Sequence, residues 1–207
     1  MRSTAKNYFE ELFEENLLDQ VIDNEDNDQL TAPFCIEDFK EAMFSMQPDK
    51  CSGPDGFNPG FNQHFWSVCR DDIYNECYQW LNEGKFPPSL NSTNVALIPK
   101  GTKQNTMKDW RPIALCNVLY KLPPKILANS LKKILHKCIV DSQLAFLPGR
   151  SILDNALVAI ELVHYIKTKT KGNEKRVALK LDISKAYDTI SWSYLKDVMY
   201  KMRLSEK

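Results

Sequence analysis

Apolar residues recur at helical spacing in the first 50 residues of the chain. Intervals of three and four residues place side chains on one face of an α-helix. The polar stretch DNEDNDQL (23–30) separates two such stripes, which predicts two amphipathic helices joined by a polar linker. The stripes are Tyr8 or Phe9 with Leu12 and Phe13, and Ile36 with Phe39, Met43 and Met46.

The segment after residue 50 opens with a turn signal and continues as two more helices. Gly53-Pro54-Asp55-Gly56 places proline second and glycine fourth, as a type I turn favours. The helical stripes that follow stop at Gly84 and Pro87-Pro88. We interpret their aromatic side chains as core rather than as a surface that stacks on nucleobases. The stripes are Phe61, Phe65 and Trp66, then Ile73, Cys77 and Trp80.

Further along, short apolar runs indicate β-strands. TNVALIPK (93–100) and RPIALC (111–116) predict a hairpin, because a polar and basic loop separates them. RVALKLD (176–182) predicts a strand buried on both faces. The fold class expected is α+β, mostly helical with a β-hairpin and one further strand. The remaining helices are predicted at 125–139, where Pro123-Pro124 delay the start, and at 152–168 and 191–203.

The net charge of zero conceals an uneven distribution along the chain. Residues 1–50 hold 4 Lys/Arg and 13 Asp/Glu, a balance of −9, whereas residues 51–207 hold 23 and 14, a balance of +9. An acidic first part and a basic remainder are suited to different partners. The basic part fits a phosphate backbone, and a solvated lysine-rich surface remains an equal alternative.

Three classes of protein are disfavoured by the composition. Purely aliphatic runs reach only about four residues, against roughly 20 for a membrane helix, so no membrane span is expected. The first 16 residues include four glutamates and three aromatic residues where a signal peptide needs an uninterrupted apolar core, which predicts an intracellular location. The six cysteines form no C-x-x-C pair, and we interpret them as reduced and mostly core thiols rather than zinc ligands.

Asp182 is the candidate metal ligand. It ends the apolar run RVALKLD, and a carboxylate fixed at a strand end is a common ligand of Mg²⁺. A helix N-cap or a turn is the alternative role. Phosphoryl transfer with two metals needs at least two converging carboxylates. Asp188 would lie about 9 Å along and about 240° around a helix from Asp182, so no local partner is evident.

Two pairs of residues are candidates for contact with phosphates. Lys100 ends one predicted strand and Arg111 begins the next, so the hairpin brings two cations together. Gln143 and Arg150 bracket the turn-rich segment LAFLPG and are candidates for contact with a nucleic-acid backbone. In each case the alternative is structural: ordinary surface cations on a hairpin, and side chains that satisfy carbonyls in an irregular turn.

Five blocks in order resemble the reverse transcriptase of LINE-type (non-LTR) retrotransposons, especially those of plants. The resemblance spans nearly the whole chain and rests on the order and spacing of the blocks. They are KCSGPDGFNPGF, FPPSLNSTNVALIPK, DWRPIALCNVLYK, SQLAFLPGRSILDNAL with ELVH, and LKLDISKAYDTISW.

The resemblance implies part of a right-hand polymerase fold. Residues 1–50 would be an acidic helical N-terminal extension, residues 51–175 the fingers, and residues 176–207 the start of the palm. Asp182 would be a catalytic, metal-binding aspartate, with the Ile183 carbonyl as a further ligand of Mg²⁺. Tyr187 would exclude a ribose 2′-hydroxyl and so favour deoxynucleotides.

The resemblance also implies partners and a location. Lys100 and Arg111 would contact an incoming deoxynucleoside triphosphate. Gln143 and Arg150 would line the pocket for template and nucleotide. The partners implied are an RNA template, a DNA primer and deoxynucleoside triphosphates, with no membrane. The life cycle of the family implies a nuclear location.

One departure from the family sets the functional expectation. Family members carry a later hairpin with a Y/F-A-D-D signature that completes the metal site, and these 207 residues contain none. We therefore expect a truncated RNA-directed DNA polymerase that is inactive by itself. The alternatives are a non-catalytic nucleic-acid-binding module and a decayed retroelement product without function. The oligomeric state stays open.

Overall fold

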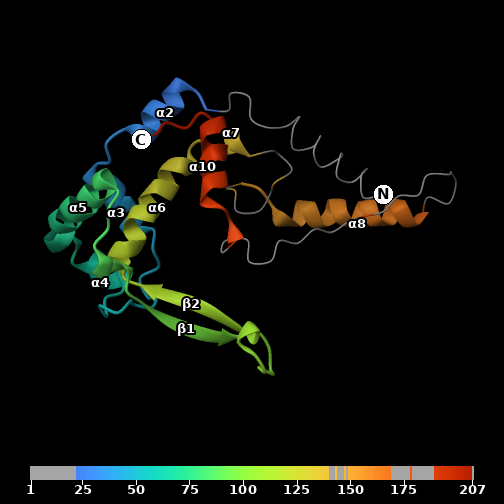
Figure 1. Ribbon diagram of the computed structural model, residues 1–207, viewed down its shortest axis with the longest axis horizontal. Helices are drawn as coiled ribbons and strands as arrows, with labels where there is room; N and C mark the ends of the chain where they lie inside the picture. Colours follow the sequence, from blue (N-terminus) through green and yellow to red (C-terminus); the bar gives the residue numbers. More distant parts are fainter. Residues whose placement is uncertain are drawn as a thin grey trace. The chain divides into compact units, whose positions relative to one another are not determined.

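The computed structural model describes residues 22–139, 143, 147, 149–168, 178 and 189–206 (Figure 1). The chain divides into two compact units. Unit 1 comprises Met1–Thr31 with Lys133–Lys207, and unit 2 comprises Ala32–Lys132. The described part is mostly helical with a two-stranded antiparallel sheet, which confirms the expected fold class. Within it, no helix is long and apolar enough to cross a membrane.

Unit 2 contains four α-helices whose ends are set by local hydrogen bonds. The Asp38 carboxylate accepts the Cys35 N–H at 2.8 Å before α3, and Asn58 Oδ1 accepts the Phe61 N–H at 2.9 Å before α4. Gly84 ends α5 with φ +62°, in the left-handed region that glycine adopts freely. The helices are α3 (Ile36–Phe44), α4 (Pro59–His64), α5 (Trp66–Glu83) and α6 (Val118–Lys132).

The core of unit 2 lies between α3, α5 and α6. Its members are 0–8% exposed, and the Phe39 ring packs edge-on against Tyr74 with centroids 5.1 Å apart. Gln63 Nε2 joins α4 to the end of α3 by donating to the carbonyls of Met43 and Met46. The core residues are Phe39, Ala42 and Met43, Trp66, Ile73 and Cys77, and Val118, Leu122 and Ile126.

Two aromatic residues predicted to be core are exposed. Phe61 is 42% exposed and Phe65 is 43% exposed, whereas Trp66 is 8% exposed. Phe65 lies between α4 and α5, with φ −94° and ψ 18°, and this break turns Trp66 inward in place of its neighbour. The three rings Phe57, Phe61 and Phe65 pack in a row, with successive centroids 4.5 and 4.8 Å apart.

The predicted hairpin is confirmed, and it extends away from the helices of unit 2 (Figure 1). Strands β1 (Thr93–Pro99) and β2 (Trp110–Cys116) pair antiparallel, from Thr93 with Cys116 to Pro99 with Trp110. The short 3₁₀ helix η2 (Met107–Asp109) lies in the tip. At the base, η1 (Pro88–Asn91) packs against α6, and its Leu90 is buried.

Unit 1 is held by contacts between distant parts of the sequence. Lys137 Nζ lies 2.7 Å from Asp26 Oδ2 and 3.4 Å from Asp23 Oδ2. Asn27 Nδ2 donates to the Arg203 carbonyl at 2.8 Å, and Asn27 Oδ1 accepts the Ser205 N–H at 2.8 Å. The described helices are α2 (Asn24–Thr31), α7 (Leu135–Cys138), α8 (Ile152–Thr168) and α10 (Trp192–Lys201), of which the last two match the predicted segments.

Three predictions about local structure were wrong. DNEDNDQL is largely helix α2, because the Asp23 carboxylate accepts the Asp26 N–H at 2.8 Å and acids favour a first turn. Helix α6 begins at Val118 with Pro123 and Pro124 inside it. Burial of Val118, Leu122 and Ile126 contributes about 1.5–3 kcal/mol each, which is comparable to the cost of the two prolines at about 3 kcal/mol each. The cysteines are free, and among them only Cys77 is buried.

Two expected elements lie outside the described residues. They are the helix around residues 8–13 and, apart from Ala178, the strand 176–182.

Candidate functional site

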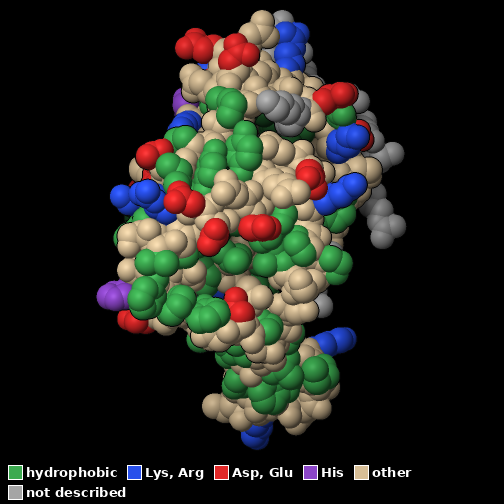
Figure 2. All heavy atoms as spheres, turned by 90° about the vertical axis from the view of Figure 1, so that its left-hand side faces the viewer, with side chains coloured by type: hydrophobic (Ala, Val, Ile, Leu, Met, Phe, Trp, Pro, Cys, Tyr) green, Lys and Arg blue, Asp and Glu red, His purple; other side chains and the backbone are tan. Residues whose placement is uncertain are grey.

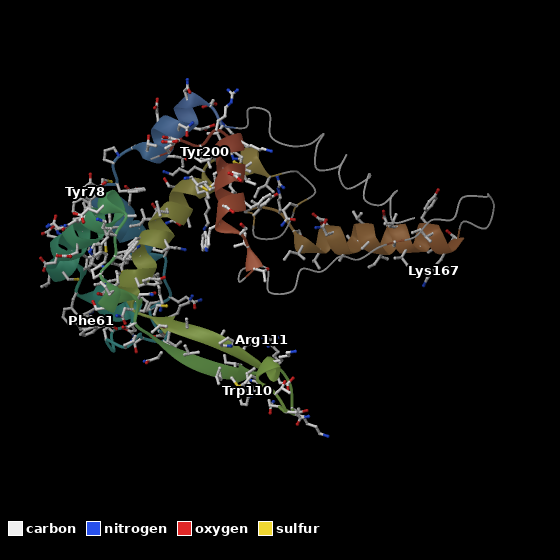
Figure 3. All side chains as sticks on the ribbon, in the orientation of Figure 1. Phe61, Tyr78, Trp110, Arg111, Lys167 and Tyr200 are labelled. Carbon is white, nitrogen blue, oxygen red and sulfur yellow. The ribbon has the colours of Figure 1, made fainter. Side chains whose placement is uncertain are left out.

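The two hairpin cations lie on one face of the hairpin. Arg111 is paired with Ile98, and the Lys100 N–H continues the ladder by donating to the Asp109 carbonyl at 2.8 Å. Directly opposed residues share a face and successive residues alternate. Lys100 directly follows β1, which ends at Pro99, so continued alternation puts it on the side of Ile98 and Arg111, where the Cα atoms of diagonal neighbours lie about 7–8 Å apart. Figure 3 shows Arg111 near the end of the hairpin that lies away from the helices.

Both cations are accessible to a ligand. Lys100 and Arg111 are exposed, and Lys100 Nζ donates to the Lys108 carbonyl at 2.6 Å. This bond holds the ammonium group at the tip without neutralising its charge. The guanidinium group of Arg111 presents donors in a planar fork that matches phosphate oxygens. The face is therefore suited to an anion with several oxygens.

The opposite face of the hairpin is apolar. Val95 is 59% exposed and Leu97 is 45% exposed, and both lie on the side away from the two cations. Pro99, Trp110 and Pro112 continue this face along the register. Figure 2 shows hydrophobic side chains gathered over the hairpin, which forms the lower protrusion in that view. The face of Arg111 also carries the exposed side chains of Ile98 and Ile113, so the two faces differ in the two cations that one of them presents near the tip, and this face is called the cationic face.

Asp109 orders the tip between the two cations. Its Oδ2 accepts the N–H groups of Asn105 at 2.9 Å and Thr106 at 2.8 Å, and the Thr106 hydroxyl at 3.1 Å. These bonds, the Thr106 N–H first, hold the pKa of the Asp109 carboxyl below its usual value, and the charge of Lys100 acts in the same direction. Sequence reasoning missed Asp109, although the T-x-x-D spacing of a capping box pointed to it.

Gln143 and Arg150 are brought together by a turn in unit 1. Arg150 Nη1 donates to the Gln143 carbonyl at 2.7 Å, and the Arg150 N–H donates to the Leu147 carbonyl at 3.4 Å. Gly149 has φ +76°, the left-handed conformation that lets the chain reverse there. Arg150 therefore satisfies a carbonyl in an irregular turn, the structural alternative.

The remaining predicted site residues lie outside the described part of the chain. They are Asp182, Ile183, Tyr187 and Asp188. Among the residues that the structure does describe, no group of three or more His, Cys, Asp or Glu side chains could hold a metal ion. Lys100 and Arg111 belong to unit 2, and Gln143 and Arg150 belong to unit 1.

Comparison with known proteins links the sequence to one enzyme family. Residues 98–207 match the family model described as reverse transcriptase (RNA-dependent DNA polymerase). The chain is 27% identical to the transposon TX1 uncharacterized 149 kDa protein of Xenopus laevis, over 94% of this chain and 16% of that protein.

Two further relatives come from insect retrotransposable elements. The chain is 26% identical to the Pol polyprotein of the type-1 element R2 of Popillia japonica, over 61% of this chain and 17% of that protein. It is 29% identical to the Pol polyprotein of the type-2 element R2DM of Drosophila melanogaster, over 71% of this chain and 13% of that protein. The chain thus spans less than a fifth of the length of these three relatives.

Proposed function

Because the chain belongs to the reverse transcriptase (RNA-dependent DNA polymerase) family, we propose that its hairpin binds the triphosphate of an incoming deoxynucleotide. The resemblance to non-LTR retrotransposon reverse transcriptases is confirmed by the family match and the relatives. A reverse transcriptase domain uses a nucleic-acid template and nucleotide substrates. The observation that carries the proposal is the placement of Lys100 and Arg111 on one exposed face.

The chemistry of this face fits the proposed ligand. Arg111 would hold two oxygens of one phosphate group, and Lys100 would supply a point charge to a neighbouring phosphate group. A hydrogen bond to a charged group contributes about 1.5–3 kcal/mol. Asp109 supports the face indirectly, because its hydrogen bonds hold the loop that joins the two strands.

The metal site of the proposed enzyme involves Asp182 and Ile183, and Tyr187 lies close by in the sequence. Polymerases of this family are generally metal-dependent. We propose that the Asp182 carboxylate and the Ile183 carbonyl hold Mg²⁺, because hard oxygen donors are the ligands that this ion takes. Bound Mg²⁺ would neutralise charge that develops on the triphosphate. Tyr187 is proposed to favour deoxynucleotides by excluding a 2′-hydroxyl.

The proposed partners are an RNA template and a DNA primer. Residues 51–207 carry a balance of +9, which supports contact with a phosphate backbone. Gln143 and Arg150 are proposed to face the template and nucleotide pocket.

Nucleotide binding tests the hairpin proposal. Titration of the 207-residue protein with a fluorescent deoxynucleoside triphosphate and Mg²⁺ should give saturable binding. Arg111→Ala should weaken it about tenfold, because one charge-assisted contact is lost. Arg70→Ala is the matched control, since Arg70 is also exposed but lies on α5 beside Asp71 at 3.5 Å. Equal affinity of the Arg111 variant and the control would overturn the proposal.

Primer extension tests the expectation that the 207-residue protein has no polymerase activity by itself. The 207 residues contain no Y/F-A-D-D signature, so the protein alone should synthesise no DNA on an RNA template with Mg²⁺. Template-dependent synthesis that Asp182→Ala abolishes would contradict this expectation and would establish that these residues suffice for catalysis.

The second candidate function is a nucleic-acid-binding module without chemistry. The charge balance of residues 51–207 favours it independently of the hairpin geometry. Under this hypothesis, RNA affinity falls steeply with salt concentration, and nucleotides do not compete with RNA. Absence of RNA binding at low salt would exclude it.

A further inference from the structure

The hairpin is attached to unit 2 only at its base. Every residue of β1 and β2 is exposed or half-buried, whereas Leu90, just before β1, and Val118, just after β2, are buried. An isolated two-stranded hairpin is marginally stable in water. The contacts at the base therefore decide where the cationic face points.

A glycine of the 53–56 turn packs tightly against this base. Gly53 is buried, and a Cβ added to it would lie under 3.0 Å from the Asn117 side chain, the Asn117 backbone nitrogen and the Cys116 carbonyl carbon. Asn117 Oδ1 also accepts the Asp55 N–H at 3.3 Å. The turn itself is closed by the Gly56 N–H, which donates to the Gly53 carbonyl at 3.1 Å.

We propose that Asn117 and Gly53 form a positioning contact that aims the cationic face of the hairpin at the bound nucleotide. This inference rests on the proposed function of Lys100 and Arg111. Asn117 is the single residue between β2 and α6, so it joins an exposed strand to a helix anchored in the core. The 53–56 turn contacts that junction through Gly53, which packs against Cys116 and Asn117, and through the Asp55 N–H, which donates to Asn117 Oδ1.

Because the hairpin is long, a small rotation at its base displaces Arg111 by several ångströms. Arg111 lies six residues from Asn117 along β2, or about 20 Å at about 3.3 Å per residue. A rotation of about 10° at the base would therefore move Arg111 by about 3.5 Å. Hydrogen bonds to charged oxygens require donor–acceptor distances of about 2.7–2.9 Å, so such a displacement would break the phosphate contact.

The hydrogen bonds of Asn117 separate this role from simple helix capping. Asparagine just before a helix usually accepts N–H groups of the first turn with its side chain. Here the side-chain oxygen accepts from Asp55, and the backbone carbonyl accepts the Lys121 N–H at 3.3 Å. The side chain thus serves the contact with the turn rather than the start of α6.

Distance measurement tests the positioning contact without nucleotide. Spin-labelled side chains at positions 68 and 107, both on exposed sites of unit 2, report the separation of α5 and the hairpin tip by double electron–electron resonance. The native protein should give one narrow distance distribution. Asn117→Ala should broaden it, and Asn117→Asp, which keeps the acceptor oxygen, should restore it. An unchanged distribution in Asn117→Ala would overturn the inference.

Nucleotide affinity then links the contact to function. Asn117→Ala and Gly53→Ala should each weaken binding of a deoxynucleoside triphosphate with Mg²⁺ about tenfold, as loss of the Arg111 contact does. Asn82→Ala and Gly101→Ala are the controls, since Asn82 is exposed on α5 and a Cβ at Gly101 meets nothing within 4 Å. Far-ultraviolet circular dichroism confirms that each variant is folded.

The outcomes separate the two proposals. If the native protein binds no nucleotide but Asn117→Ala broadens the distances, the proposed function fails and the contact at the base stands. If the distances broaden while nucleotide affinity stays native, the positioning role toward the nucleotide is refuted. If Gly53→Ala does not fold, the comparison of Asn117→Ala with Asn117→Asp decides whether the inference holds.

Discussion

Raising the pH above 9 should destabilise unit 2 through one buried thiol. Cys77 is fully buried among the core residues of α3, α5 and α6. Burial raises the pKa of Cys77 from 9.0 to about 12, and the charge of Glu76 adds to this shift. A raised pKa in the folded state means that the thiol's contribution is complete below pH 9 and is lost between pH 9 and about 12.

The size of the effect follows from the two pKa values. At pH 10.5 an unfolded thiol with a pKa of 9.0 is mostly ionised, whereas the folded thiol with a pKa of about 12 is mostly neutral. This difference lowers the free energy of unfolding by about 2 kcal/mol relative to pH 8. Domains are typically stable by only about 5–15 kcal/mol, so the loss is measurable.

Urea denaturation at pH 8 and pH 10.5, followed by tryptophan fluorescence, measures the effect, because Trp66 lies in this core and Trp80 packs against it. Other groups also titrate in this range, so Cys77→Ala is the control that retains them and lacks the thiol. The difference in the free energy of unfolding between the native protein and Cys77→Ala should shrink by about 2 kcal/mol at the higher pH, because only the native protein has the buried thiol and is destabilised. An offset that is the same at both pH values would refute the burial of Cys77 in this core.

Three further predictions concern local structure. Gly84→Ala should cost about 1 kcal/mol in urea denaturation, because its φ is +62° although a Cβ would meet open space, whereas Gly101→Ala should be nearly neutral. The Thr106 amide in NMR spectra should titrate with a midpoint below 3.8, the ordinary value for an aspartate, since the hydrogen bonds that Asp109 accepts lower the pKa of its carboxyl; a midpoint above 3.8 would show that these hydrogen bonds are absent. Asp26→Ala should raise the rates of amide hydrogen exchange in α2, because it removes the carboxylate that Lys137 contacts at 2.7 Å. Unchanged exchange rates would show that this ion pair does not stabilise α2.

Elements with a strong hydrophobic period were predictable from the sequence. The hairpin, α3, α8 and α10 follow from apolar spacing and turn residues. In α3 this spacing buries Phe39, Ala42 and Met43, whereas no described side chain of α8, α10, β1 or β2 is buried. α2 was not predictable in this way, since its stability comes from the Asp23 cap and from Lys137, which is distant in sequence. The start of α6 was not predictable either, because two prolines lie inside the helix and such residues usually mark a helix start.

The candidate site was predictable in its residue types and less so in its geometry. Strand ends placed Lys100 and Arg111 near each other, and the register then fixed them on one face. The contact between Gly53 and Asn117 could not be predicted, because it depends on how a turn packs against a junction more than 60 residues later. The roles of Asp182, Ile183 and Tyr187 remain predictions from the family resemblance.

The Asn27 contacts have a consequence for the order in which the chain folds during synthesis. Residues 32–132 form one continuous unit, so unit 2 can assemble as soon as the ribosome has released it. α2 emerges earlier, yet its partners Lys137, Arg203 and Ser205 follow 111, 176 and 178 residues later. Unit 1 therefore closes last, after unit 2 can already have folded, and its slow step is expected to be the search for these distant contacts.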